Sequence, residues 1–108
     1  MAGEIPEGLA IEPIWVVEAT YAPDAAERRP AVRSEHLARI ARLRDAGTIV
    51  EAGGFADMSG SLLLVRAASE AAARDVVSQD VYLRSGVWTG FRVRSLGRVV
   101  RRSEQGQD

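Results

Sequence analysis

His36 is the residue of this sequence best suited to acid–base chemistry, because it is the only histidine and imidazole exchanges a proton near neutral pH. It lies within residues 30–47, where apolar side chains recur at spacings of three to five and predict an amphipathic helix. Ile40 and Leu43 follow it at i+4 and i+7, so the three side chains share one face. His36 is therefore a candidate general acid or base in a pocket between helix and sheet. The alternative is a core histidine whose ring nitrogens bond backbone or water.

Asp80 is the candidate partner of this histidine. It follows Val77 by three residues and so continues the inner face of a second predicted helix, over residues 70–79. A carboxylate at the C-terminal end of a helix opposes the helix dipole by roughly 0.3–1 kcal/mol, which predicts a compensating cation. A positively charged His36 would supply that cation, and the pair would lower the pKa of Asp80. The alternative is an exposed aspartate that opens a turn over residues 80–86.

Three further side chains are candidates for binding a ligand at the same place. Arg33 lies three residues before the histidine on the same side of the helix, where it could hold a carboxylate or phenolate. Its alternative is a solvated arginine or one paired with Asp24 or Glu35. Tyr21 ends the first predicted strand and Tyr82 follows the aspartate, so each could present a hydroxyl group to the pocket. Aromatic residues at such positions also serve packing alone.

Composition excludes several classes of function. A length of 108 residues indicates one domain, and a net charge of −1 argues against nucleic-acid binding, which needs a strong basic excess. The absence of cysteine excludes disulfides, thiolate metal sites and a cysteine nucleophile, and one histidine cannot form a histidine-rich metal site. We therefore expect no metal site, and the leading hypothesis given below expects no cofactor. No apolar run approaches the ~20 residues of a membrane span, and no signal peptide is recognisable, so a cytoplasmic location is expected.

The predicted elements follow the order β-α-β-β-α-β. Strands are expected over residues 14–21, 48–52, 61–67 and 87–94, helices over residues 30–47 and 70–79, and a short fifth strand over residues 97–101. This order is that of the ferredoxin-like α+β fold, in which four antiparallel strands pack two helices on one face. We expect a single domain over residues 14–101, a flexible N-terminal leader over residues 1–13 and a disordered tail over residues 102–108.

The sheet face away from the helices predicts a partner. In a monomer that face should carry mainly polar residues, whereas the predicted strands are apolar on both faces. The apolar residues that suggest this are Trp15, Val17, Leu63, Val65 and Trp88. A second copy of the chain that covers the open face in a symmetric homodimer is the simplest explanation, with any higher assembly left open.

The sequence resembles the YciI-like (YCII-related) family over residues 14–100. The residues that carry the resemblance are Arg33-Ser34-Glu35-His36-Leu37, Asp45-Ala46-Gly47, Gly53-Gly54-Phe55 with Asp57, Gly60-Ser61, and Asp80-Val81-Tyr82 with Gly86. No single motif is specific, but the ordered set with this spacing is.

The resemblance implies a fold and a site. The family fold is a ferredoxin-like unit that dimerises into an α+β barrel. In the family, the site pairs the histidine of the first helix with the aspartate after the second helix, and these positions fall on His36 and Asp80. The family's arginine before the histidine falls on Arg33. Family members usually follow the aspartate with proline, which would fix the turn, and here Val81 takes that position. The wider superfamily includes isomerases, lyases and cofactor-free oxygenases.

The leading hypothesis is a small cofactor-independent enzyme of the lyase or isomerase type. His36 would transfer a proton, Asp80 would orient and stabilise its imidazole, and Arg33 would hold an anionic group of a small organic, cyclic or aromatic metabolite. The first alternative is a non-catalytic module, in which the same pocket binds a small molecule or the dimer assists another enzyme. The second is a structural dimer in which the histidine is a plain core residue.

Overall fold

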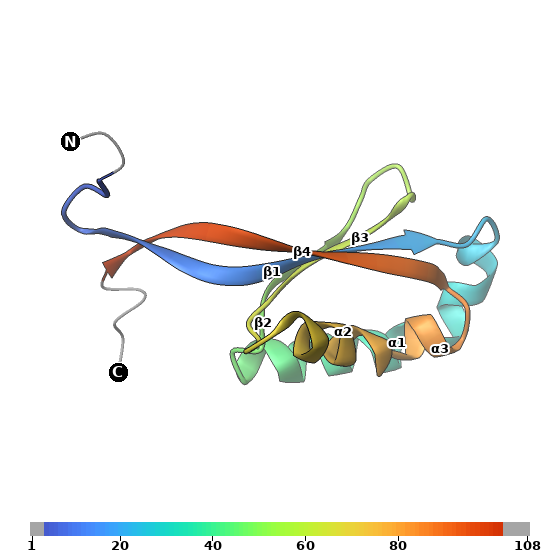
Figure 1. The fold of residues 1–108 in the computed structure, drawn as a ribbon. Coiled ribbons are helices and arrows are strands. Elements are labelled where there is room, and N and C mark those ends of the chain that lie inside the picture. The colour runs from blue at the N-terminus through green and yellow to red at the C-terminus, as the bar shows by residue number, and fades with distance from the viewer. Residues whose placement is uncertain (1–3, 103–108) are drawn as a thin grey trace.

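The structure is a computed structural model that describes residues 4–102. It forms one antiparallel sheet whose strands lie in the order β2-β3-β1-β4, with the helices on one face (Figure 1). The elements are β1 (Leu9–Tyr21), α1 (Ala25–Asp45), β2 (Ile49–Gly54), β3 (Gly60–Val65), α2 (Glu70–Ser78), α3 (Val81–Arg84) and β4 (Trp88–Arg101). Apart from the short α3, this is the expected β-α-β-β-α-β order, and the ferredoxin-like α+β prediction is confirmed.

The first and last strands are longer than expected. β1 pairs with β4 from Leu9↔Arg101 onward, and this two-stranded part projects beyond the rest of the sheet (Figure 1). The irregular leader expected over residues 1–13 is therefore wrong for its last five positions, and residues 1–3 lie outside the described part. β4 is continuous, so the separate strand expected over residues 97–101 is its end. The expected tail, except for its first residue, also lies outside the described part.

Pro13 misled the prediction because proline is unfavourable inside a sheet. The pairing of β1 with β3 begins at Trp15, so at Pro13 the strand has a neighbour, β4, on one side alone. Proline lacks an N–H and is accepted where that side of the strand needs no partner.

The helix α1 begins at Ala25, before the expected start at Pro30, and the loop expected over residues 22–29 is mostly helical. Its end agrees with the prediction. Gly47 has a φ of +81°, in the left-handed region, and its N–H bonds the Arg44 carbonyl, while the Thr48 N–H bonds the Leu43 carbonyl. These two bonds are those of a Schellman closure, which glycine favours.

The β2–β3 hairpin and α2 place the remaining site residues. β2 runs through Gly54, so the two glycines expected to close this strand lie within it. Gly60 is required by close packing, since a Cβ there would lie 2.0 Å from the Ala19 carbonyl oxygen of β1. α2 begins as expected after Ser69, whose side chain accepts the Ala72 N–H at 3.1 Å.

The core lies between the helices and the sheet. Its members include Val17, Leu63, Val65 and Trp88, and Trp15 packs against them. These five residues were expected to show that the open face is apolar, and that interpretation is wrong because all of them face the helices. The open face, read from the strand register, carries Ile14, Val16, Leu62, Leu64 and Leu96 beside two groups of ion pairs, Glu18 with Arg92 and Arg94, and Glu12 with Arg66 and Arg98.

No helix within residues 4–102 has both the length and the apolar character needed to cross a membrane. Within the same residues, no three or more histidine, cysteine, aspartate or glutamate side chains are grouped closely enough to hold a metal ion.

Candidate functional site

His36 and Asp80, which the sequence singled out separately, are in direct contact. The Nδ1 atom of His36 lies 2.7 Å from Oδ1 of Asp80, although the residues are 44 positions apart. His36 projects from α1 with 8% of its surface exposed, and Asp80, just before α3, is 1% exposed. The contact is therefore largely screened from water. A charged hydrogen bond is stronger in such a buried environment than at the surface.

Asp80 is held by the N-terminus of α3 as well as by the histidine. Its Oδ1 accepts the Tyr82 backbone N–H at 2.9 Å, which makes it the N-cap of α3. Asp80 directly follows Gln79, the C-cap of α2, so it lies at the C-terminal end of that helix as the sequence argument expected, and the structure adds the N-terminus of α3 on its other side. Val81 occupies the first position of α3, where proline is favoured, and the capped turn forms with valine in that place.

Arg39 is a second cation at this carboxylate and was not singled out from the sequence. Its Nη1 donates to Oδ2 of Asp80 at 3.2 Å, and its Nη2 donates to the Val76 carbonyl at 2.6 Å. Arg39 follows His36 by three residues, so the spacing that identified Arg33 also pointed to it. Both oxygens of Asp80 are therefore occupied, one by His36 and one by Arg39.

These contacts settle the charge of the aspartate. Burial raises the pKa of Asp80, but the hydrogen bonds from His36 and the Tyr82 N–H, with the positive charges of His36 and Arg39, outweigh it and lower the pKa. An ionised Asp80 can only accept, so the proton between the two side chains belongs to Nδ1 of His36. The Nε2 atom of the ring bonds no residue between 4 and 102 and is the nitrogen available to a ligand.

Aromatic rings fix the plane of the imidazole. The ring of Tyr82 stacks on that of His36 with centroids 3.7 Å apart and 5° between the planes. Trp88 meets the imidazole edge-on at 5.4 Å, and it meets Tyr82 in the same way at 5.5 Å. Burial raises the pKa of Tyr82, with an opposing effect from the nearby charge of Arg29, so its phenol stays protonated at neutral pH. The sequence treated Trp88 only as a sheet residue, because its contact with the histidine is made by tertiary packing.

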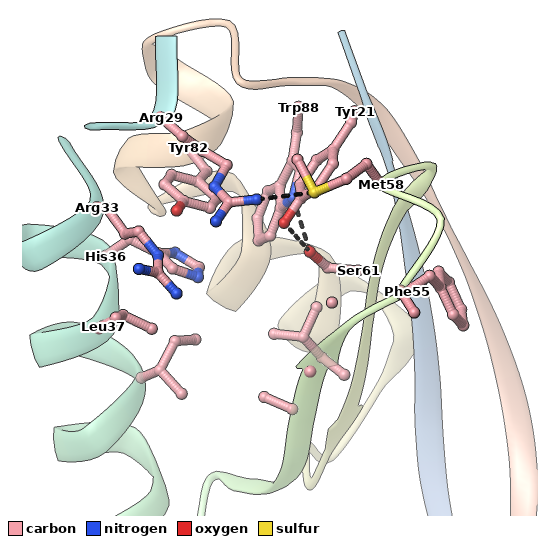
Figure 2. A pocket seen from close by; sticks show the side chains of 16 residues that line it. Tyr21, Arg29, Arg33, His36, Leu37, Phe55, Met58, Ser61, Tyr82 and Trp88 are labelled. Atoms are coloured by element: carbon pink, nitrogen blue, oxygen red, sulfur yellow. Dashed lines mark hydrogen bonds between the residues drawn. The ribbon is translucent and has the colours of Figure 1, made fainter. Parts of the chain in front are cut away.

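A pocket of about 330 Å³ opens beside these rings, a size suited to a small molecule (Figure 2). His36, Arg33, Tyr21 and Tyr82 line it, whereas Asp80 lies behind the histidine. Lining residues not singled out from the sequence include Arg29, Phe55, Met58, Ser61 and Trp88.

The charge of the pocket is positive. Arg29 and Arg33 both line it, and no acidic side chain among the described residues does. Arg33 forms no ion pair within the described part of the chain. Its two expected partners are paired elsewhere, Asp24 with Arg28 at 2.8 Å and Glu35 with Arg84 at 3.6 Å. An exposed arginine without a carboxylate partner beside a pocket is suited to an anionic ligand.

Comparisons with known proteins place this chain in a family. A model of the YCII-related domain matches residues 14–96. The chain is 30% identical over 95 residues to an uncharacterized protein of Haemophilus influenzae, and the alignment covers 79% of this chain and 97% of that protein. It is also 30% identical over 96 residues to Protein YciI of Escherichia coli, and that alignment covers 80% of this chain and 98% of the relative.

A solved structure shares the fold. It is the 5-chloro-2-hydroxyhydroquinone dehydrochlorinase (TftG) of Burkholderia phenoliruptrix AC1100 in complex with 2,5-dihydroxybenzoquinone. The TM-score is 0.64 at 22% sequence identity, and the match covers 75% of this chain and 90% of that one. At this identity the likeness establishes the fold, and the neighbour is an enzyme that binds a small molecule.

Proposed function

This chain belongs to the YCII-related family, and we propose that it is a small cofactor-independent enzyme of the lyase or isomerase type. In this proposal His36 and Asp80 act as a dyad for proton transfer on a small cyclic or aromatic anion. The observation that carries the proposal is the 2.7 Å contact between Nδ1 of His36 and the buried, ionised Asp80, beside a pocket that the imidazole lines.

The proposed chemistry follows from the assignment of the ring protons. Asp80 accepts a hydrogen bond from the protonated Nδ1 of His36. In the neutral ring Nε2 therefore carries the lone pair and can remove a proton from a bound molecule. The imidazolium formed is stabilised by the Asp80 carboxylate, as in hydrolytic triads where aspartate orients a histidine without taking its proton. The hydrogen bonds from His36 and the Tyr82 N–H, with a smaller effect of the Arg39 charge, keep the pKa of Asp80 lowered despite its burial. In an isomerisation the same Nε2 then returns the proton to another carbon of the molecule. In an elimination the electron pair of the broken C–H bond forms a double bond, the bond to a leaving group breaks with its electrons, and the proton on Nε2 passes to that leaving group or to solvent.

The proposed substrate class follows from the walls of the pocket. Tyr82 and Trp88 offer flat apolar surfaces, and Arg29 and Arg33 supply positive charge at the same pocket. A planar ring that carries a carboxylate, phenolate or enolate oxygen matches both properties. The fold neighbour is a dehydrochlorinase that binds 2,5-dihydroxybenzoquinone, a small planar ring with two acidic hydroxyls, and it supports the class by analogy.

Proton removal can be tested before the natural substrate is identified. We expect the protein to catalyse deuterium incorporation into enolisable cyclic keto acids or hydroxylated quinones in D2O, observed by 1H NMR. Arg33→Ala should raise KM about 5- to 10-fold, because an exposed charged hydrogen bond to the anion is lost. Arg42→Ala, which removes an exposed arginine of α1 outside the pocket, should leave KM unchanged. Ligands that bind but never exchange and are recovered unaltered would instead establish the non-catalytic binding module.

We also propose that a second copy covers the open face of the sheet. Support comes from the apolar belt of Val16, Leu62, Leu64 and Leu96, which lies between two sets of ion pairs on that face and is not fully buried by the chain itself. Leu64→Arg should convert the protein to a monomer in light scattering coupled to gel filtration, because it places a charge inside the belt. Ala38→Arg, on the exposed side of α1, should leave the assembly unchanged. A wild-type monomer at micromolar concentration contradicts the proposal.

A further inference from the structure

Three side chains from three strands form a hydrogen-bonded chain in the pocket wall (Figure 2). The Nε1 atom of Trp88 lies 3.2 Å from Oγ of Ser61, and that oxygen lies 3.3 Å from Oη of Tyr21. Trp88 is 1% exposed and Ser61 is 6% exposed, so the inner part of this chain is closed to water.

The direction of the chain is determined by its buried end. An indole N–H only donates, so Oγ of Ser61 must accept from Trp88. The hydrogen of Ser61 then has Oη of Tyr21 as its acceptor. In the reverse arrangement the buried Ser61 hydrogen would lack an acceptor among residues 4–102, which is unfavourable. The hydroxyl of Tyr21 therefore accepts from the protein and keeps its own hydrogen for another partner.

The surroundings of Tyr21 leave that hydrogen accessible to the pocket. Tyr21 lines the pocket, and a Cβ at Gly54 would come within 3.3 Å of its Oη, so the glycine leaves space beside the hydroxyl. The guanidinium of Arg29 lies 5.8 Å from the centre of the Tyr21 ring. A positive charge nearby and an accepted hydrogen bond both make a phenol a stronger donor.

Resting on the proposed function, we infer that Tyr21 is the hydrogen-bond donor for a substrate oxygen that becomes negative during proton transfer. As Nε2 of His36 takes the proton, the electron pair of the broken C–H bond moves into the conjugated carbonyl, whose oxygen becomes an enolate. Tyr21 donates a hydrogen bond to that oxygen without losing its proton, and no covalent bond to the protein forms. Donors directed at a developing oxyanion are a major source of rate acceleration. Ser61 is a positioning residue, since it acts through Tyr21.

The inference narrows the substrate class. The molecule should carry a carbonyl or ring hydroxyl conjugated with the carbon that loses its proton, in addition to the anionic group near Arg33. Tyr82 touches both reacting groups, stacked on His36 and edge-on to Tyr21 with ring centroids 6.5 Å apart, so a flat ligand beside it can reach both.

The hydrogen-bonded chain is tested first in the ligand-free protein. The protein contains two tryptophans, Trp15 and Trp88. The Trp15 indole N–H donates to the Ala67 carbonyl at 3.1 Å, outside the hydrogen-bonded chain, so Trp15 is an internal control. In 15N-resolved NMR spectra, Ser61→Ala should shift the Trp88 indole resonance and speed its hydrogen exchange, while that of Trp15 stays in place. An unchanged Trp88 resonance would show that Trp88 does not donate to Ser61, and it would overturn the hydrogen-bonded chain on which the inference rests.

The donor role is tested with 2,5-dihydroxybenzoquinone as probe, titrated by its visible absorption. Tyr21→Phe should weaken binding about 10- to 100-fold, because it removes one hydrogen bond to a charged oxygen. Ser61→Ala should give a smaller loss and a changed absorption spectrum of the bound probe. Thr89→Ala, which removes an exposed hydroxyl of β4 outside the pocket, is the matched control and should bind as wild type does.

The outcomes separate the two proposals. Absence of probe binding to the wild-type protein overturns the ligand class of the proposed function, and the donor role with it. Wild-type binding together with unchanged affinity and spectrum in Tyr21→Phe overturns the donor role alone and leaves the His36–Asp80 proposal standing.

Discussion

His36→Gln is expected to lower kcat for proton transfer at least about 100-fold while the protein stays folded. Glutamine has a similar volume and can still donate to Asp80, but it cannot exchange a proton near neutral pH. KM should change little, because the anion is held by Arg33 and the aromatic walls. The measurement is the deuterium-exchange rate at saturating ligand, beside a thermal melt that reports the fold.

Asp80→Asn should lower kcat by a comparable factor for a different reason. The amide is neutral, so it cannot stabilise the imidazolium, and its NH2 group can donate to Nδ1 and favour the wrong tautomer of His36. Arg42→Gln, on the same helix as His36 and outside the pocket, is the control for general effects of substitution. Normal turnover in both His36→Gln and Asp80→Asn would mean that the dyad is structural.

The second large effect is on stability. Asp80→Asn is expected to lower the free energy of unfolding at pH 7 by about 1.5–3 kcal/mol, the usual contribution of hydrogen bonds to a charged group. The wild-type carboxylate, 1% exposed, accepts from His36, Arg39 and the Tyr82 N–H, and asparagine replaces an ionised acceptor by a neutral group. Urea denaturation followed by tryptophan fluorescence measures the difference.

The pH dependence identifies the charge as the cause. The pKa of Asp80 is lowered in the folded protein from 3.8, so its contribution is complete well above that value and is lost as the pH falls through the folded-state pKa. Wild type and Asp80→Asn should therefore differ at pH 7 and converge in acid. Asp45→Asn, an exposed aspartate at the end of α1, should follow wild type throughout. A gap of constant size down to low pH would assign the loss to altered packing.

Periodicity was sufficient to bring the candidate pair together. Counting from the apolar residues of two helices placed His36 and Asp80 on inner faces, and in this fold those faces meet over the sheet. The N-terminus of α3, which also holds Asp80, was nevertheless missed, because so short a helix could not be recognised from four residues. Local propensity is weak over so short a segment.

Prolines accounted for two of the errors. Pro30 was interpreted as a helix start and Pro13 as part of an irregular leader, since proline is most common in those settings. The structure continues α1 ahead of the first and pairs the second with Gly97 of β4. The pairing of Pro13 depends on a strand distant in sequence, which local rules do not include, and nothing in the structure explains why α1 begins ahead of Pro30.

The missed members of the site are those whose roles arise from tertiary contacts. Trp88 and Ser61 come from different strands, and their hydrogen bond to each other and to Tyr21 depends on strand register. Arg39 has an ordinary position on the helix, and only the location of Asp80 gives it a partner. Sequence spacing shows which residues share a face of one helix or strand, whereas tertiary packing decides which residues of different elements come into contact.

The position of β4 as the last strand in the sequence also determines when the site can form during synthesis. β4 pairs with β1 and carries Trp88, which closes the pocket against His36 and Tyr82. A ribosome-bound chain that has emerged only as far as α3 contains the histidine and the aspartate but not this wall. Ligand affinity therefore belongs to chains that have added β4, and a ligand present in the cell would stabilise them selectively over incomplete products.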